Sequence, residues 1–399
     1  MRVYLDNSAT TAVAPEVIDA MLRYFAEEPG NAGSVHSFGQ RAKAAVETAR
    51  RQVAALIGAA PAEIVFTSGG TEADNIAVRG TAETNREHGR RVITTAIEHL
   101  AVLATCEALE REGYRVTYLP VSSTGLVNVA DVRKAIEPDT ILISVMHANN
   151  ETGTIQPLEE IAELVGQTRA AGLKHLRFHT DAVQSVGKTP VDVNRLGIDL
   201  LSLSAHKIHG PKGVGALYVR KGTQLAKLVW GGHQERDRRA GTENVPGIVG
   251  LGRAAEIARV ELDDRIARMR EQRDYLESQV KMRVNGVRLN GDLGQRVPSV
   301  SNLSFGGMDG ESLLIALDLK GVAVSTGSAC ASGAHEPSHV LRAMGLKREE
   351  VRGSLRLSVG AYTTRDEIDY AVGVLEETVA RLREMRPADQ ETSSEAARP

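Results

Sequence analysis

Short apolar runs alternate with longer amphipathic segments through the first two thirds of the chain. The apolar runs predict strands at 64–67, 91–96, 114–120, 140–147, 175–179, 198–204 and 214–219. Segments such as 15–28, 38–57, 100–112 and 158–171 space their apolar residues as helices do. Strands and helices in alternation predict an α/β fold with a largely parallel sheet that helices cover on both faces.

The pattern changes after Gly241. Residues 245–284 are mostly helical with a charged face, and strands at 297–305, 321–325 and 354–359 then alternate with helices at 310–320 and 364–386. This pattern predicts a smaller α+β lobe. We expect a large domain over 15–257, a small domain formed by 1–14 and 258–386, and a disordered polar tail over 387–399.

The composition narrows the class of protein. A chain of 399 residues with 42% hydrophobic and 25% charged residues is typical of a globular protein with more than one lobe. Its 48 basic and 51 acidic residues balance to −3, so we expect no nucleic-acid partner. We see no signal segment and no membrane-spanning run, which predicts a cytoplasmic protein without a membrane partner. The two cysteines, Cys106 and Cys330, exclude a disulfide framework.

Reactive side chains follow the predicted strands at their carboxyl ends. Thr71 follows strand 64–67, His99 follows 91–96, Asn150 follows 140–147, Asp181 follows 175–179 and Lys207 follows 198–204. In open α/β sheets ligands bind beyond this edge. We therefore expect these residues to share one site.

Lys207 and Asp181 indicate the chemistry of that site. A lysine amine can hold a carbonyl cofactor as a Schiff base, and an aspartate can fix a pyridinium nitrogen. Taken alone, a lysine after a strand is more often a solvated loop residue. Its occurrence with Asp181 and the other strand-end residues favours pyridoxal 5′-phosphate (PLP) chemistry.

Other residues of this edge admit two interpretations each. The turn Ser68-Gly-Gly-Thr71 opens a helix where backbone N–H groups favour a phosphate, but Ser68 or Thr71 could simply cap that helix. His99 could stack on a cofactor ring and move protons, or form a structural hydrogen bond. Histidines near Asp181 suggest a metal, yet no close-spaced ligand pair is present, so we expect no metal in the site.

Cys330 lies in a run of small residues, Ser325-Thr-Gly-Ser-Ala-Cys-Ala-Ser-Gly-Ala-His335. Such a run cannot pack a core, so we expect a flexible loop over 325–335 that belongs to the small domain. The loop could carry the thiol into a cationic site and so activate it; an incidental exposed cysteine is the alternative. Cys106, by contrast, follows a helical apolar pattern and is expected in the core.

Arg356 lies in an alternating strand, Leu355-Arg-Leu-Ser-Val359. An inward-facing arginine could bind a substrate carboxylate through two hydrogen bonds. Taken alone, a solvated arginine at the edge of a sheet is the more common case.

The motifs together resemble those of the group I cysteine desulfurases, the NifS/IscS-like branch of the class V aminotransferases. The resemblance extends from Tyr4 to about Arg386. Its most specific parts are Phe66-Thr-Ser-Gly-Gly-Thr-Glu72, Asn149-Asn-Glu-Thr-Gly153, His179-Thr-Asp-Ala-Val-Gln184, Ser204-Ala-His-Lys207, Arg239-Ala-Gly-Thr242 and Ser325-Thr-Gly-Ser-Ala-Cys330.

The resemblance implies a fold-type I PLP enzyme that forms a homodimer with its active site near the subunit interface. It also implies a role for each matched residue. Around the cofactor ring, Lys207 would form the Schiff base, Asp181 would pair with the pyridine nitrogen, Gln184 would bind the ring hydroxyl and His99 would stack on the ring. The phosphate would be held by Gly70, Thr71, Ser204 and His206, together with Thr242 of the other subunit. Asn150 would contact cofactor and substrate, Arg356 would bind the substrate carboxylate, and Cys330 would carry a persulfide.

The implied reaction converts L-cysteine to L-alanine, with Lys207 removing the Cα proton and Cys330 taking the sulfur. The sulfur would pass to an acceptor such as an iron–sulfur scaffold protein, or to thio-cofactor or tRNA thiolation pathways. The alternatives are a PLP-dependent aminotransferase or lyase in which Cys330 is incidental, a selenocysteine lyase, and a non-catalytic scaffold or binding protein.

Overall fold

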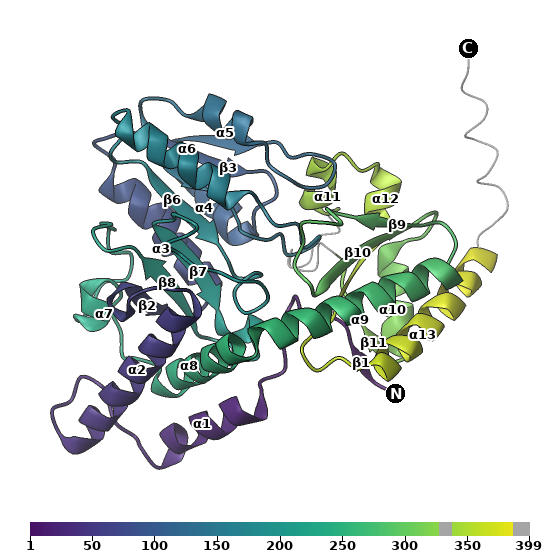
Figure 1. The fold of residues 1–399 in the computed structure, drawn as a ribbon, viewed down its shortest axis with the longest axis horizontal. Coiled ribbons are helices and arrows are strands. Elements are labelled where there is room, and N and C mark those ends of the chain that lie inside the picture. The colour runs from purple at the N-terminus through teal and green to yellow at the C-terminus, as the bar shows by residue number, and fades with distance from the viewer. Residues whose placement is uncertain (327–336, 386–399) are drawn as a thin grey trace.

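A seven-stranded sheet organises the large lobe of the computed structural model, which describes residues 1–326 and 337–385 (Figure 1). Every strand predicted for this lobe is present, with ends that differ by a few residues. Their order across the sheet is β2 (Ile64–Thr67), β8 (Gly215–Val219), β7 (Leu200–Ser204), β6 (Arg177–Asp181), β5 (Thr140–Ser144), β3 (Arg91–Thr95) and β4 (Arg115–Leu119). The predicted α/β class is therefore confirmed.

The sheet is parallel except at β8, which runs antiparallel to both β7 and β2. Only residues 205–214 join β7 to β8, and this connection is too short for the crossover that a parallel pair needs. Because β2 is antiparallel to β8, β2 points the same way as the remaining strands. The carboxyl ends of β2, β3, β5, β6 and β7 therefore lie at one edge.

Helices cover both faces of this sheet. One face packs against α3 (Gly70–Thr84) and α4 (Leu100–Arg111), and the other packs against α2 (Ser37–Leu56), α6 (Leu158–Ala170) and α8 (Val245–Val260). The lobe also contains α1 (Pro15–Ala26), α5 (Val129–Ala135), the short α7 (Gln234–Asp237), and 3-10 turns at Pro61–Glu63 and Ala205–Lys207. Cys106 of α4 is buried, as predicted.

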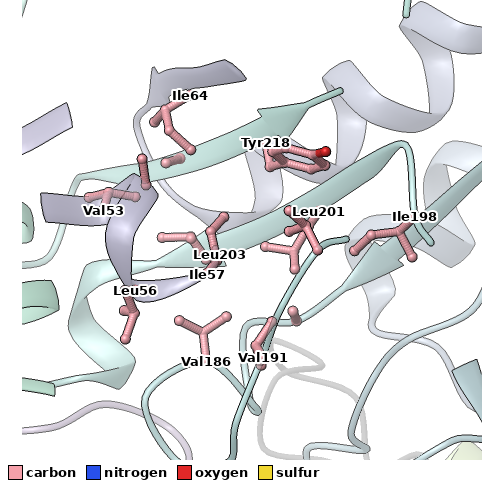
Figure 2. Close-up of a cluster of buried hydrophobic side chains, with 14 of the residues drawn as sticks. Val53, Leu56, Ile57, Ile64, Val186, Val191, Ile198, Leu201, Leu203 and Tyr218 are labelled. Atoms are coloured by element: carbon pink, nitrogen blue, oxygen red, sulfur yellow. The ribbon is translucent and has the colours of Figure 1, made fainter. Parts of the chain in front are cut away.

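The apolar runs are continuous because both faces of these strands are buried. On β7, Leu200 packs toward α3, whereas Leu201 and Leu203 pack toward α2. Figure 2 shows Leu201 and Leu203 with Val53 of α2 and with Ile57, which directly follows this helix. Full burial of each such side chain contributes roughly 1.5–3 kcal/mol.

The small lobe is built on a second, antiparallel sheet in the described residues. Its strand β10 (Val300–Phe305) lies between β9 (Val287–Asn290) and β12 (Ser354–Ser358). The lobe's helices are α9 (Leu262–Arg283), α10 (Gly310–Leu319), α11 (His339–Ala343), α12 (Arg348–Arg352) and α13 (Arg365–Glu384). Of these elements, the sequence pattern did not predict β9, α11 and α12.

The N-terminus belongs structurally to the small lobe. Strand β1 (Val3–Tyr4) pairs in parallel with β11 (Val322–Ala323), and Leu5 packs in the same apolar core as Leu303. The chain then enters the large lobe, and α9 follows α8 back toward the small one (Figure 1). The exact division into domains stays a prediction, and the predicted disordered tail over 387–399 lies outside the described residues.

None of the helices in 1–326 and 337–385 combines the length and the apolar character that a membrane span requires.

Candidate active site

A cavity of about 250 Å³ lies at the edge where the parallel strands end. Both lobes contribute to its wall. Ten residues predicted from the sequence line it: Gly70, Thr71, His99, Asn150, Asp181, Gln184, Ser204, His206, Lys207 and Arg356. Five further lining residues were not predicted: Ser8, Ala9, Asp74, Met146 and Val183. The structure thus brings together residues that are up to about 350 positions apart.

Lys207 ends the 3-10 turn that directly follows β7. Its Nζ donates to the carbonyl oxygens of Ser8 at 2.5 Å and Ala9 at 2.7 Å. The N-terminal segment is fixed there because the N–H of Thr11 donates to the carbonyl of His206. Ser8 and Ala9 act through their backbones, so residue type carried no signal for them.

Asp181 is the last residue of β6, and only 5% of it is exposed. Its Oδ1 accepts the backbone N–H of Val183 at 2.9 Å, and no ion pair within the described residues reaches it. Burial raises the pKa of this carboxyl, although His99, this N–H and Lys207 oppose the rise. The site therefore contains a buried carboxyl that a cationic ligand group would stabilise.

A second buried acid, Asp74 of α3, lies beside Asp181. Burial, and then the charge of Asp181, raise its pKa well above the usual range, which favours a neutral Asp74. Behind it, the ring of His179 lies between the hydroxyls of Ser144 at 2.8 Å and Ser202 at 3.1 Å. This network supports the edge of the sheet beneath Asp181.

His99 caps the N-terminus of α4. Its Nδ1 accepts the backbone N–H of Ala101 at 3.1 Å, so the ring proton of the neutral form is on Nε2. Burial lowers the pKa of His99 and favours that neutral form. The ring therefore lines the cavity as an apolar face with one N–H.

Asp74, His99 and Asp181 place one potential ligand atom each within 4.8 Å of one another. A neutral Asp74 is a poor metal ligand, because ligation requires the carboxylate. His99 already uses Nδ1 as the cap of α4. The expectation of no metal in this site stays a prediction.

The N-terminus of α3 forms one end of the cavity. Gly69 is the cap residue, and neither Ser68 nor Thr71 provides a side-chain cap, which differs from the simple capping interpretation. A Cβ at Gly70 would lie 2.7 Å from Cγ2 of Val183, so only glycine allows this close approach. The helix start therefore presents backbone N–H groups next to the hydroxyls of Thr71 and Ser204.

His206 lies next to these hydroxyls. Its Nδ1 is 3.1 Å from Oγ1 of Thr10, and burial lowers its pKa to about 4. The residue is thus neutral near pH 7 and contributes a hydrogen-bonding group rather than a charge.

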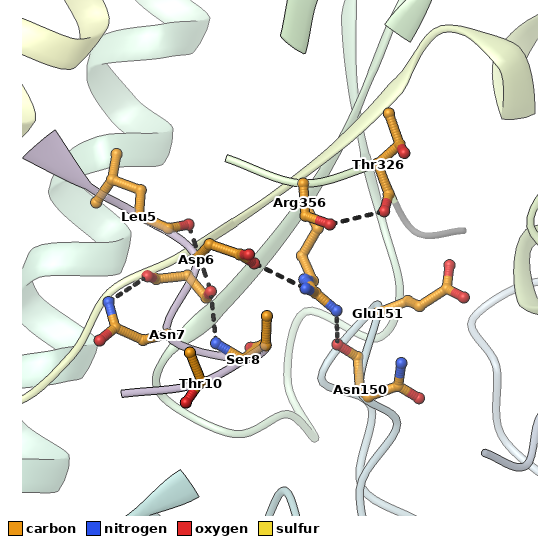
Figure 3. Close-up of polar contacts among 12 residues, drawn as sticks. Leu5, Asp6, Asn7, Ser8, Thr10, Asn150, Glu151, Thr326 and Arg356 are labelled. Carbon is orange, nitrogen blue, oxygen red and sulfur yellow. Dashed lines mark hydrogen bonds and ion pairs between the residues drawn. The ribbon is translucent and has the colours of Figure 1, made fainter. Parts of the chain in front are cut away.

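Arg356 of β12 enters the cavity from the small lobe (Figure 3). Its Nη2 donates to Oδ1 of Asp6 at 2.8 Å and its Nη1 donates to the carbonyl of Asn150 at 3.1 Å, whereas its Nε has no partner within the described residues. Only 2% of the arginine is exposed, so the interpretation as a solvated edge residue is wrong. Asp6 is a site residue that the sequence analysis missed, because it lies 350 positions from Arg356.

One predicted residue does not line the cavity, and another is not among the residues that the structure describes. Thr242 is exposed and lies outside the cavity lining, and Cys330 lies outside the described residues. The start of the segment 325–335 is nevertheless placed: the N–H and carbonyl of Ser325 pair with the backbone of Arg356 at 3.1 and 2.7 Å.

Comparison with known proteins agrees with this arrangement. The model of the aminotransferase class-V family matches residues 3–371. The chain belongs to this family.

Its relatives within the class V aminotransferases carry the names expected from the motifs. A cysteine desulfurase IscS of Dictyoglomus turgidum is 49% identical over 98% of this chain and 97% of its own length. The IscS of Methanosarcina thermophila is 50% identical over 96% of this chain and 94% of its own length. The predicted membership of the cysteine desulfurases is confirmed, and the enzymes of this family depend on PLP.

Solved structures are similar as well. A NifS-like protein superposes with a TM-score of 0.90 at 41% identity, covering 96% of this chain and 100% of its own. SspA in complex with cysteine superposes with a TM-score of 0.78 at 36% identity, covering 91% and 100%. These neighbours confirm the predicted fold-type I architecture.

Proposed function

We propose that this protein is a PLP-dependent cysteine desulfurase that converts L-cysteine to L-alanine and collects the sulfur as a persulfide on Cys330. The observation that carries the proposal is the pairing of Lys207 with Asp181 in one cavity. The lysine offers an amine for the aldehyde of the cofactor, and the buried acid offers a partner for a pyridinium N–H. The IscS names of relatives that match nearly the whole chain support the same activity.

The described residues fit PLP. Asp181 lacks an ion-pair partner within the described part of the chain, which suits a protonated ring nitrogen. His99 offers an apolar face for a ring, and Gln184 offers an amide for the ring hydroxyl. The free N–H groups at the start of α3, together with Thr71, Ser204 and His206, suit a phosphate.

When bound, PLP supplies an electron sink that stabilises negative charge at Cα of the substrate. Lys207 would hold the cofactor and then move the Cα proton, a role that contributes about 10²–10⁴-fold in rate for a well-placed base. Asp181, held by Val183, would keep the proton on the ring nitrogen. His99 would donate or accept a proton only through Nε2, since Nδ1 is used as a helix cap.

Arg356 and Asn150 would orient the substrate. The Nε of Arg356 is a buried donor without a partner among the described residues, and such a donor is costly unless another group satisfies it. A carboxylate that bridges Nε and an Nη would satisfy it in the two-bond geometry that arginine favours. Asp6 holds the guanidinium in place through its ion pair with Nη2.

Cys330 would complete the reaction. Its thiolate attacks the substrate sulfur, the Cβ–S bond breaks, and the carbon fragment leaves as alanine after taking up a proton. The balance is L-cysteine plus enzyme thiol giving L-alanine plus enzyme persulfide. The sulfur would then pass to an acceptor, for which we propose an iron–sulfur scaffold protein.

The proposal is tested by incubating the purified protein with L-cysteine and a thiol reductant. We expect sulfide and alanine in equal amounts, and we expect the Cys330→Ala variant to bind PLP but to release less than about 1% of the sulfide, because its nucleophile is missing. Normal sulfide yield from Cys330→Ala would contradict the role of Cys330. An amino-group balance that requires a keto acid would indicate an aminotransferase instead.

We further propose a cytoplasmic homodimer in which Thr242 completes the phosphate site of the other subunit. Thr242 is exposed and outside its own cavity. Helix α1 also exposes Ile18, Leu22 and Phe25 at helical spacing, which provides apolar surface for an interface. Light scattering that shows a monomer at micromolar concentration would contradict the dimer.

A further inference from the structure

Lys188 is a buried amine that the proposed reaction does not use. Only 5% of the residue is exposed, and it follows Gly187, whose φ is +72°. Its Nζ donates to Oε1 of Gln184 at 2.9 Å. No carboxylate within the described residues forms an ion pair with it. A lysine buried without an acid is rare because the charged form loses its hydration.

The charged and titratable neighbours of Lys188 among the described residues are basic, and the acids Glu261 and Asp6 form ion pairs with two of these neighbours, Arg265 and Arg356. The charges of Lys207 and Arg356 lower the pKa of the Lys188 amine, and the charge of Lys188 in turn lowers the pKa of His206 and His209. Arg265 lines a small neighbouring cavity together with Lys188. Burial, followed by Lys207 and Arg356, lowers the pKa of Lys188 to about 7. The amine therefore changes its charge close to neutral pH.

Lys188 determines which way the amide of Gln184 faces. Lys188 donates to Oε1, and Nε2 donates to the carbonyl of Ser8 at 2.9 Å. The reversed amide would set N–H groups against the lysine and oxygen against the carbonyl, so both contacts would be lost. In the observed orientation, the second N–H of Nε2 has no acceptor within the described residues, and Gln184 lines the cavity.

The same bonds connect the two lysines. The carbonyl of Ser8 accepts from Gln184 Nε2 and also from Lys207 Nζ. A short chain of hydrogen bonds thus runs from Lys188 through Gln184 and Ser8 to Lys207. Through this chain Lys188 can influence the cavity without lining it.

We propose that Lys188 is a positioning residue that fixes the amide of Gln184, so that an N–H rather than a carbonyl meets the ring oxygen of the bound cofactor. This inference rests on the proposed function, because the oxygen concerned is the ring hydroxyl of PLP. A fixed donor stabilises that oxygen as an anion, and the nearby amine adds positive charge. Both effects make it easier for the bound cofactor to lose its proton.

The test is the pH midpoint of the change in the visible absorption band of the bound cofactor. We expect Lys188→Met, which keeps the length but removes the donor and the charge, to raise this midpoint by about one pH unit. Lys188→Gln, which keeps an N–H donor, should raise the midpoint less than Lys188→Met does. This variant replaces Lys188→Met in the test if the methionine variant does not fold. Lys134→Met is the matched control, since the side chain of Lys134 is 77% exposed on α5.

A double-mutant cycle shows whether Lys188 acts through Gln184. In a Gln184→Ala background, Lys188→Met should shift the midpoint by clearly less than in the unmodified protein, because only the effect of the lysine charge remains to be removed. An unchanged midpoint in Lys188→Met, or a full shift in the Gln184→Ala background, would overturn the proposal. If the unmodified protein shows no visible band with PLP, the proposed function fails instead, so the two failures are distinguishable.

Discussion

The two walls of the cavity handle buried charge in opposite ways. The wall from the large lobe carries Asp181 and Asp74, which have raised pKa values and no cationic partner among the described residues, since burial lowers the pKa of the nearby His179 to about 3. The wall from the small lobe carries Arg356, which is already paired with Asp6. The difference shows that the acidic wall would be stabilised by a cationic group, which under the proposed function is the cofactor ring, whereas the basic wall would offer its charge to the proposed substrate carboxylate.

The largest effect on activity is expected when the carboxylate of Asp181 is removed from the large-lobe wall. We expect Asp181→Asn to lower kcat about thirtyfold or more, because losing one partner of a buried charge pair costs about 2–5 kcal/mol. Asp74→Asn is the matched control on the same wall. Since Asp74 is expected to be neutral already, this change should alter kcat less than about threefold. Steady-state sulfide release measures both, and equal losses would show that Asp181 has no special role.

A change on the other wall should affect substrate binding. Arg356→Lys keeps the charge but loses the planar guanidinium that can donate two parallel hydrogen bonds to a carboxylate. We therefore expect KM for cysteine to rise about tenfold or more while kcat changes less. Asp6→Asn, which removes only the counter-charge, should raise KM by a few-fold. Arg352→Lys, at a side chain that is 70% exposed, should change neither constant. A fall in kcat alone for Arg356→Lys would place this arginine outside the carboxylate site.

The smallest effect on activity is expected for Glu98, another buried acid behind the large-lobe wall. Burial raises its pKa from 4.5 to about 8, so between these values the folded protein holds a proton that the unfolded chain has lost. The stability of the cofactor-free protein should therefore fall as pH rises from about 5 to about 8. Glu98→Gln, which stays neutral, should lose less stability over that interval. Thermal unfolding at a series of pH values tests this, and parallel curves for the two proteins would contradict it.

Much of the site was predictable from sequence because alternation of strands and helices determines which edge the reactive residues share. Asp181 ends its strand, His99 and Lys207 follow theirs, and the parallel order brings those strand ends together. Their motifs supported the same assignment. Local pattern was therefore sufficient wherever a residue's position depends on its own strand.

The residues that sequence reasoning missed depend on long-range packing. Asp6 meets Arg356 only because β1 crosses to the small lobe, and Ser8 contributes a backbone carbonyl that any residue could provide. Lys188 resembles any other lysine until its burial is known. The antiparallel β8 follows from the short connection after Lys207, which the strand pattern alone did not specify.

The central claim is that Lys207 holds the cofactor by a covalent bond, and hydride reduction followed by peptide mass spectrometry tests it directly. After incubation with PLP and borohydride, we predict a pyridoxyl group on Lys207 and none on Lys188, a buried lysine near the cavity. A protein without the label, or one labelled at Lys188 in place of Lys207, would contradict the account.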